Sequence, residues 1–226
     1  MKTSKNDSRE LGYAMSRLRN REYLERYIKR PLQETYNRLC DEDGLLLECM
    51  DIALLLIFVH IDLLGRLYAG EAYTGNKGTT KNAVIFMERY LGDVDKRYQE
   101  VSALLYHTLR HGYVHVFTPK RIQLHNGDGL DFSLSPYHRY TKHLSIRRMK
   151  ENENVIKRWN IHVSQLFKDL IGAIDVYAEE INFNQDITDK FYKSFVARRI
   201  EDSEDKLRLK TSLDYNKGFD YIHSQT

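Results

Sequence analysis

The stretch from Leu45 to Tyr68, LLLECMDIALLLIFVHIDLLGRLY, limits the fold more than any other part of this 226-residue chain. Its apolar residues lie on nearly every side of a helix, which is typical of a helix at the centre of a bundle. The run is interrupted by Glu48, Asp51, His60 and Asp62. It therefore lacks the roughly 20 clean apolar residues that a membrane helix needs. We expect a core built around this helix and no membrane partner.

Nothing near the N-terminus or in the cysteine pattern indicates secretion. The first residues, MKTSKNDSRELGY, have no apolar core like that of a secretory signal. Cys40 and Cys49 are separated by eight residues and fit neither a zinc knuckle nor a disulfide framework. We expect reduced thiols and a cytoplasmic location.

Helical periodicity continues on both sides of the apolar run. Residues 8–38 have sparse apolar positions interrupted by Pro31, which predicts two short outer helices. A turn is predicted at 41–44 and a loop at 70–80. Thr79 or Thr80, at the end of that loop, is placed to cap the next helix. Further helices are predicted at 81–91, where Gly92 ends the helix, at about 95–111, at 155–181 and near 187–200.

A β-element is predicted between these helices. Residues 114–136 alternate apolar and polar positions around Asn126-Gly127-Asp128-Gly129, which is a strong hairpin signal. The basic run 137–150 continues as strand or loop. The fold class is mainly α: a helical bundle with a small β-hairpin insertion. We divide it into an N-terminal helical arm (1–40), a bundle (41–200) with the β-insertion at about 116–146, and a polar tail (201–226).

Three histidines lie on the helix that precedes the insertion. His107, His111 and His115 are four residues apart, so their rings lie about 40° apart per step on one helix face. Such a stripe resembles the metal ligands of a metal-dependent hydrolase, with His60 and Asp62 as ligands from another helix. The helix itself offers no Glu at the i−3 position of any of the three. We therefore predict no metal and no other cofactor, and keep the metal-dependent hydrolase as an alternative.

Arg110 and His115 suggest a second chemistry, cleavage of RNA without a metal. The guanidinium suits a phosphate, and an imidazole can accept or donate a proton while the ribose 2′-OH attacks. Five helical steps place the two residues about 140° apart, too far to meet at one phosphate. Either the helix loosens at Gly112, or a second subunit completes the site. A purely structural alternative is that Arg110 binds the carbonyls of the helix end and that His115 is a core histidine.

The segment Arg110-His111-Gly112-Tyr113-Val114-His115 resembles the R-x4-6-H motif of HEPN domains. Its context, LLYHTLRHGYVH, is similar to that of several bacterial HEPN families, and the resemblance covers roughly residues 44–181. HEPN domains are helical bundles, many of them metal-independent endoribonucleases of toxin and defence systems. The resemblance implies a homodimer with two copies of the motif facing one cleft. It also implies catalytic roles for Arg110 and His115, with His111 helping to orient the site.

Basic residues after the motif suggest how RNA is held. Residues 110–168 contain 11 Lys and Arg against 4 Asp and Glu, although the whole chain has a net charge of only +3. Such a segment attracts a polyanion, although a solvated basic face with no partner is the alternative. The predicted RNA-binding residues are Lys120, Arg121, Arg139, Lys142, Arg147 and Arg148. Besides RNA and a second copy, an antitoxin or other protein is a possible partner, and a catalytically silent HEPN interaction module is the other alternative.

Overall fold

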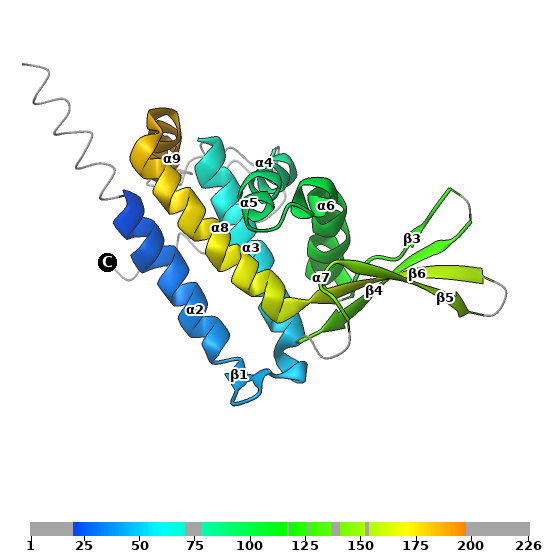
Figure 1. Cartoon of the computed structure of the whole chain (residues 1–226). Coiled ribbons are helices and arrows are strands. Elements are labelled where there is room, and N and C mark those ends of the chain that lie inside the picture. Colours follow the sequence, from blue (N-terminus) through cyan, green and yellow to red (C-terminus); the bar gives the residue numbers. More distant parts are fainter. Residues whose placement is uncertain are drawn as a thin grey trace, which may run out of the picture.

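Helices make up most of the described structure, and a four-stranded sheet projects from one end of them (Figure 1). The computed structural model describes residues 20–70, 78–116, 118–125, 127–136, 141–151 and 154–197. The mainly α fold class is therefore confirmed. Within these ranges no helix is both long enough and apolar enough to span a bilayer. The predicted tail, 201–226, lies outside the described residues.

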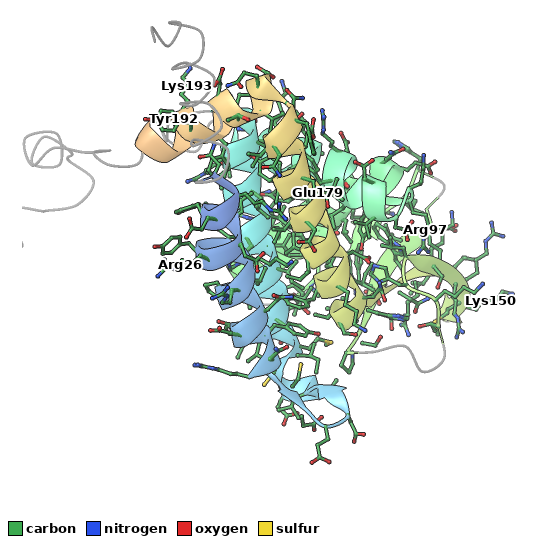
Figure 2. The ribbon with its side chains drawn as sticks, turned by 60° about the vertical axis from the view of Figure 1, so that its left-hand side comes forward. Arg26, Arg97, Lys150, Glu179, Tyr192 and Lys193 are labelled. Carbon is green, nitrogen blue, oxygen red and sulfur yellow. The ribbon has the colours of Figure 1, made fainter. Side chains whose placement is uncertain are left out.

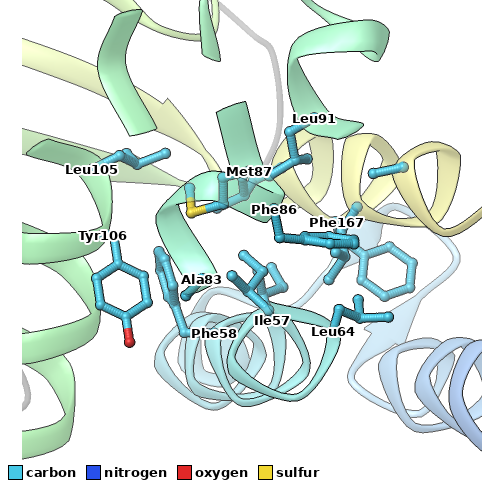
Figure 3. Close-up of a cluster of buried hydrophobic side chains, with 14 of the residues drawn as sticks. Ile57, Phe58, Leu64, Ala83, Phe86, Met87, Leu91, Leu105, Tyr106 and Phe167 are labelled. Atoms are coloured by element: carbon cyan, nitrogen blue, oxygen red, sulfur yellow. The ribbon is translucent and has the colours of Figure 1, made fainter. Parts of the chain in front are cut away.

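The apolar run forms the central helix α3 (Met50–Ala69), which follows a short 3₁₀ turn, η2 (Leu47–Cys49). One side of α3 is buried, and Figure 3 shows Ile57, Phe58 and Leu64 packed against side chains of the neighbouring helices. The described residues leave the opposite side open to solvent, since Ile52 and Val59 are 55% and 58% exposed. The prediction of a central helix is confirmed, but its burial on all sides is wrong.

The helix after α3 starts and stops at places that differ from the prediction. It runs without interruption through α4 (Thr79–Phe86), the π-helical turn η3 (Met87–Leu91) and α5 (Gly92–Val94). Thr79 is its first residue rather than its cap, and Gly78 is the N-cap in a left-handed conformation (φ +104°). Gly92 does not end the helix. A Cβ there would lie 2.7 Å from Cγ of Gln99, so this glycine permits close packing instead.

The helix that carries the motif is longer than predicted. It comprises α6 (Tyr98–Leu105), the π-helical turn η4 (Tyr106–Arg110) and α7 (His111–Val116). It passes through Gly112, where a Cβ would lie 2.3 Å from the carbonyl oxygen of Thr118. The glycine is thus required by the chain that crosses this helix, and the helix does not loosen there. Leu104 lies outside the buried face of this helix and is 39% exposed.

The N-terminal part of the described chain is one helix rather than two. It runs from residue 20 through the π-helical turn η1 (Leu24–Lys29) into α2 (Arg30–Asn37). Pro31 does not break it, because the wide turn just before it accommodates a residue without an N–H. Helix α2 packs on α8 through the stacked rings of Tyr36 and Phe167, whose centroids are 3.6 Å apart. The predicted turn at 41–44 is confirmed, and it joins β1 (Cys40–Asp41) to β2 (Gly44–Leu45).

The sheet contains β3 (Ile122–Gln123), β4 (Gly129–Ser135), β5 (Ser145–Glu151) and β6 (Asn154–His162) in the order β3-β4-β6-β5. The predicted hairpin is confirmed by the antiparallel pairing of β3 with β4. The prediction of a helix from residue 155 is wrong, since β6 occupies this segment and pairs parallel to β4 and antiparallel to β5. The β-insertion therefore extends to residue 162 instead of 146.

Two helices close the described chain. Helix α8 (Val163–Phe183) buries an apolar stripe against α3, with Leu166, Leu170 and Tyr177 fully inside. Helix α9 (Gln185–Ala197) confirms the helix predicted near 187–200 and packs beside the C-terminal half of α3. Together α3, α4, α8 and α9 form the base from which the motif helix and the sheet are positioned.

Candidate functional site

Arg110, the first residue of the motif, is held by an acidic residue of the central helix. Its Nε and Nη2 donate hydrogen bonds to Oδ2 of Asp62 on α3, at 3.3 and 3.1 Å. The side chains of Arg110 and Asp62 are 24% and 17% exposed. Asp62 engages one edge of the guanidinium, and Nη1 lies on the other edge. Arg110 is thus a partly buried, ion-paired arginine rather than a cap on the carbonyls of a helix end.

Tyr106 completes this arrangement from one turn earlier on the same helix. Its hydroxyl donates a 2.6 Å hydrogen bond to Oδ1 of Asp62, so each carboxylate oxygen has a partner from the motif helix. Burial, and then the hydrogen bond to Asp62, raise the pKa of Tyr106. The π-helical turn η4 contains both Tyr106 and Arg110, which fixes the pair on the side that faces α3. Tyr113 is also buried.

The histidine stripe is only partly described. The rings of His107 and His111 are 5.5 Å apart, and His111 also meets the ring of Tyr106 edge-on at 5.7 Å. His60, on α3, donates from Nδ1 to the carbonyl oxygen of Leu56, and burial lowers its pKa. Within the described part of the chain, no three His, Cys, Asp or Glu side chains lie close enough together to hold a metal ion.

His115 lies on α7, and the structure describes only its main chain. Because α7 stays helical through Gly112, the directions of Arg110 and His115 remain about 140° apart around the helix. One of the two ways for them to converge, loosening at Gly112, is therefore wrong. Arg110 and His115 can then meet at one phosphate only if a second copy of the chain supplies one of the two residues.

The predicted RNA-binding residue Lys120 lies beside the motif helix. The segment 118–120 crosses this helix over Gly112, and the main-chain N–H of Lys120 donates to the carbonyl oxygen of Thr108 at 3.1 Å. The side chain of Lys120 is exposed. Arg121 follows with its side chain 74% exposed and forms a 3.3 Å ion pair with Asp131. These two basic residues connect the motif helix to the base of the sheet.

The other predicted RNA-binding residues belong to strand β5 and to the segment that precedes it. Arg147 and Arg148 are exposed on the edge strand β5, and their side chains point to opposite faces because strand residues alternate. Lys142 is exposed before β5, and Arg139 lies outside the described residues. Figure 2 shows Lys150, also on β5, far from the helices. The residues do not form one patch with Arg110 but extend from its helix along the sheet.

Two features of this region escape sequence reasoning. The sequence suggests Asp62 only as a metal ligand, whereas in the structure its carboxylate accepts hydrogen bonds from Arg110 and Tyr106. Arg158 and Lys157 lie opposite Arg147 and Arg148 on β6, in a segment predicted to be helical. Only the interruption of the apolar run by Asp62 signals that this carboxylate needs a partner.

Comparisons with protein-family models, with curated proteins and with solved structures return no match for this chain.

The Asp62–Arg110 pair yields a stability prediction. In a double-mutant cycle of Asp62→Asn and Arg110→Gln, we expect a coupling energy of about 1–2 kcal/mol, because the pair is partly buried and charge-assisted. Urea unfolding at neutral pH measures it. The exposed pair Lys190–Asp186 is the matched control, with an expected coupling of roughly 0.3–0.5 kcal/mol. Additive effects at Asp62 and Arg110 would contradict the prediction.

Proposed function

We propose that this chain is a HEPN-like RNA-binding protein of a toxin or defence system, and that it cleaves RNA without a metal at Arg110 and His115. The motif Arg110 to His115 supports the family, and the mainly helical fold agrees with it at the level of fold class. RNA binding has its own support from the sheet.

The observation that carries RNA binding is the pairing of like charges across β5 and β6. Arg147 lies opposite Arg158, and Arg148 lies opposite Lys157. Directly opposed like charges destabilise a strand pair. On β6 the two basic residues also have acidic neighbours: Asp131 is shared by Arg121 and Arg158, and Asp128 lies 3.8 Å from Lys157. The two pairs lie on opposite faces of the sheet, and a polyanion on either face relieves the repulsion of the pair there; single-stranded RNA provides regularly spaced phosphates.

Affinity and chemistry are then divided between two parts of the molecule. Asp62 neutralises much of the charge of Arg110, so this arginine contributes little to overall attraction. Its Nη1 edge is the side available to a phosphate, while Asp62 fixes the orientation of the guanidinium. Lys120 and Arg121 link this position to the sheet. The strands supply most of the binding energy, and the motif helix aligns one ribose-phosphate linkage.

In the proposed reaction, the ribose 2′-oxygen attacks phosphorus and its proton passes to an imidazole. The bond from phosphorus to the 5′-oxygen breaks, and a protonated imidazole gives its proton to that leaving oxygen. The products are a 2′,3′-cyclic phosphate and a 5′-hydroxyl. His115 supplies the imidazole, and the guanidinium of Arg110 offsets the charge that develops on the phosphate oxygens. His111, whose ring packs on Tyr106, helps keep the motif helix in position.

The second copy that this geometry requires has a candidate surface on α3. Ile52, Leu56, Val59 and Leu63 follow one another at spacings of four, three and four, as in the seam of a coiled coil. Ile52 and Val59 are exposed, and Asp62 lies beside Val59 and Leu63 on the same helix. We propose that this face pairs with its own copy, which brings two motif helices toward one cleft.

A catalytically silent module is the second candidate, and one observation favours it. The ion pair of Arg110 with Asp62 has the form of a structural contact that joins two helices. In such a module the protein would act through RNA or through a protein partner such as an antitoxin.

Reversal of charge on β5 tests RNA binding. In Arg148→Glu we expect weaker binding to single-stranded RNA and a salt dependence whose slope falls by about 1. Folding stability should be unchanged or slightly higher, because the repulsion from Lys157 is removed. Fluorescence anisotropy at several salt concentrations and urea unfolding measure the two quantities. Arg26→Glu, the same change on the helical side, should leave binding nearly intact (Figure 2). Equal weakening by both variants would refute a specific role of the sheet.

Cleavage is tested with mixed RNA in the presence and absence of EDTA. We expect cleavage that survives chelation, leaves 2′,3′-cyclic phosphate ends and falls at least about 100-fold in Arg110→Ala and in His115→Ala. His107→Ala, on the exposed side one turn earlier, is the control and should retain activity. Loss of cleavage on chelation would indicate the metal-dependent alternative. RNA binding without cleavage under any condition would indicate the silent module.

The proposed α3 interface is tested by oligomeric state. Light scattering at micromolar concentration should show a dimer for the natural sequence and a monomer for Val59→Asp, since a buried carboxylate disfavours an apolar seam. Phe183→Asp, at an equally apolar but separate position that is 84% exposed, should remain dimeric. A monomer at all concentrations in the natural sequence would remove this interface and, with it, the two-copy site.

A further inference from the structure

A buried hydrogen-bonded network joins the sheet to the helical bundle, and it is separate from the proposed RNA site. Its centre is His143, which lies just before β5 and is 2% exposed. The Nε2 of His143 is 2.9 Å from the hydroxyl of Tyr98 on α6, and that hydroxyl donates to Oδ2 of Asp169 on α8 at 2.7 Å. Gln165 donates to the other carboxylate oxygen at 2.7 Å. One imidazole thus connects two helices with the start of the edge strand.

The hydrogen bonds determine the protonation state of His143. The main-chain N–H of His162 donates to Nδ1 of His143 at 2.9 Å, so Nδ1 must carry a lone pair. Independently, Tyr98 uses its only proton on Asp169, so Nε2 must carry the hydrogen that is donated to Tyr98. Both requirements give the same neutral Nε2–H tautomer. An imidazolium has hydrogens on both nitrogens, and its Nδ1–H would face the N–H of His162.

The backbone around His143 also depends on this network. Leu144, the next residue, has φ +58°, a left-handed conformation that is unfavourable for a residue with a side chain. It is held by a hydrogen bond from its N–H to the carbonyl oxygen of Asn160 on β6 and by burial of its side chain. Arg97 donates to the carbonyl oxygen of His143. An open surface pocket of about 280 Å³, lined in part by Thr141, Lys142 and His143, lies beside this segment.

We propose that His143 is an acid-sensitive switch: protonation of its imidazole breaks the bond to the His162 N–H and releases residues 141–146 from the bundle and from β6. The strained conformation of Leu144 favours release once that bond is lost. Because β5 carries Arg147 and Arg148, the switch changes how the basic strand is held relative to the helices. It acts whether or not the chain cleaves RNA.

Some of the charged and titratable groups around His143 favour protonation of its imidazole, and others oppose it. Asp169 on α8 lies 3.9 Å from Nε2 and favours the imidazolium, and Asp95 before α6 acts in the same sense. Arg97 opposes it, as do the N–H of His162 on β6 and burial itself. The ring of His162 is 5.7 Å away and is bonded through Nε2 to Thr141. Burial outweighs the hydrogen bonds from Tyr98 and Gln165 and raises the pKa of Asp169, so this carboxyl is the competing site for the proton.

The sign of the effect follows from the bond to His162. The folded state accepts a proton on His143 only by losing that bond, whereas the released segment accepts it freely. Acid therefore favours release, and the attached form is maintained above the ordinary pKa of histidine, about 6.5.

Trp159 provides a direct measurement. It is the single tryptophan of the chain, it is 2% exposed on β6, and it pairs across the strands with Ile146 of β5. On titration from about pH 8 to about pH 5 we expect a reversible red shift of its emission, centred near or below pH 6.5. His143→Asn and His143→Gln, which cannot titrate, should not show the transition. His125→Gln, at an exposed histidine between β3 and β4, should retain it.

Asp169→Asn separates the two candidate proton acceptors. If His143 titrates, the transition persists and moves to lower pH by about one unit, because the anion that favours the imidazolium is gone. If Asp169 titrates, the transition disappears and the proposal is wrong.

Hydrogen exchange on the natural sequence covers the case in which the variants do not fold. After correction for intrinsic rates, the amides of Leu144 and His162 should lose protection in acid while amides in the middle of α3 keep theirs. Uniform loss across the chain, no loss at all, or a fluorescence transition that persists in both His143 variants would each overturn the proposal.

Discussion

Burial of one side of α3 is the constraint on which the rest of the described structure depends. Each large apolar side chain removed from water contributes roughly 1.5–3 kcal/mol, and α3 places Leu54, Ile57, Phe58, Ile61 and Leu64 inside. Helices α4, α8 and α9 are positioned by the need to cover these residues. The motif helix covers the remaining buried part, where Phe58 meets Tyr106 edge-on. This packing brings Tyr106 and Arg110 within hydrogen-bond distance of Asp62 on α3. The polar contacts of Asp62 are therefore a consequence of the apolar packing between the two helices.

Periodicity identified the helices but not how they are joined. The apolar spacing predicted each of the main helices, because burial on one face leaves a pattern in any sequence. It placed helix ends at Pro31, at Gly92 and near residue 111, whereas the helices of the structure continue past all three. Local rules assign a free-energy cost to proline and glycine inside a helix. The tertiary structure nevertheless favours glycine at 92 and 112, because Gln99 and Thr118 approach these positions too closely for a side chain. At Pro31 a π-helical turn removes the conflict.

In the site, too, residues within one segment could be predicted from the sequence, whereas contacts between distant segments could not. Arg110 and Lys120 were identified from one stretch of sequence, and the structure places them on and beside one helix. The role of Asp62 was not predicted, because its partners are 44 and 48 residues away. The opposition of Arg148 to Lys157 depended on recognising β6, whose apolar residues also suit a helix. Strand pairing is non-local, and only the partner strands decide it.

The position of β6 has a consequence for how the sheet can come apart. It is the last strand of the described chain and yet lies in the interior of the sheet, with β4 on one side and β5 on the other. During synthesis β4 and β5 therefore cannot be joined until the residues of β6 have emerged. A disturbance that displaces these nine residues therefore separates both neighbours at once.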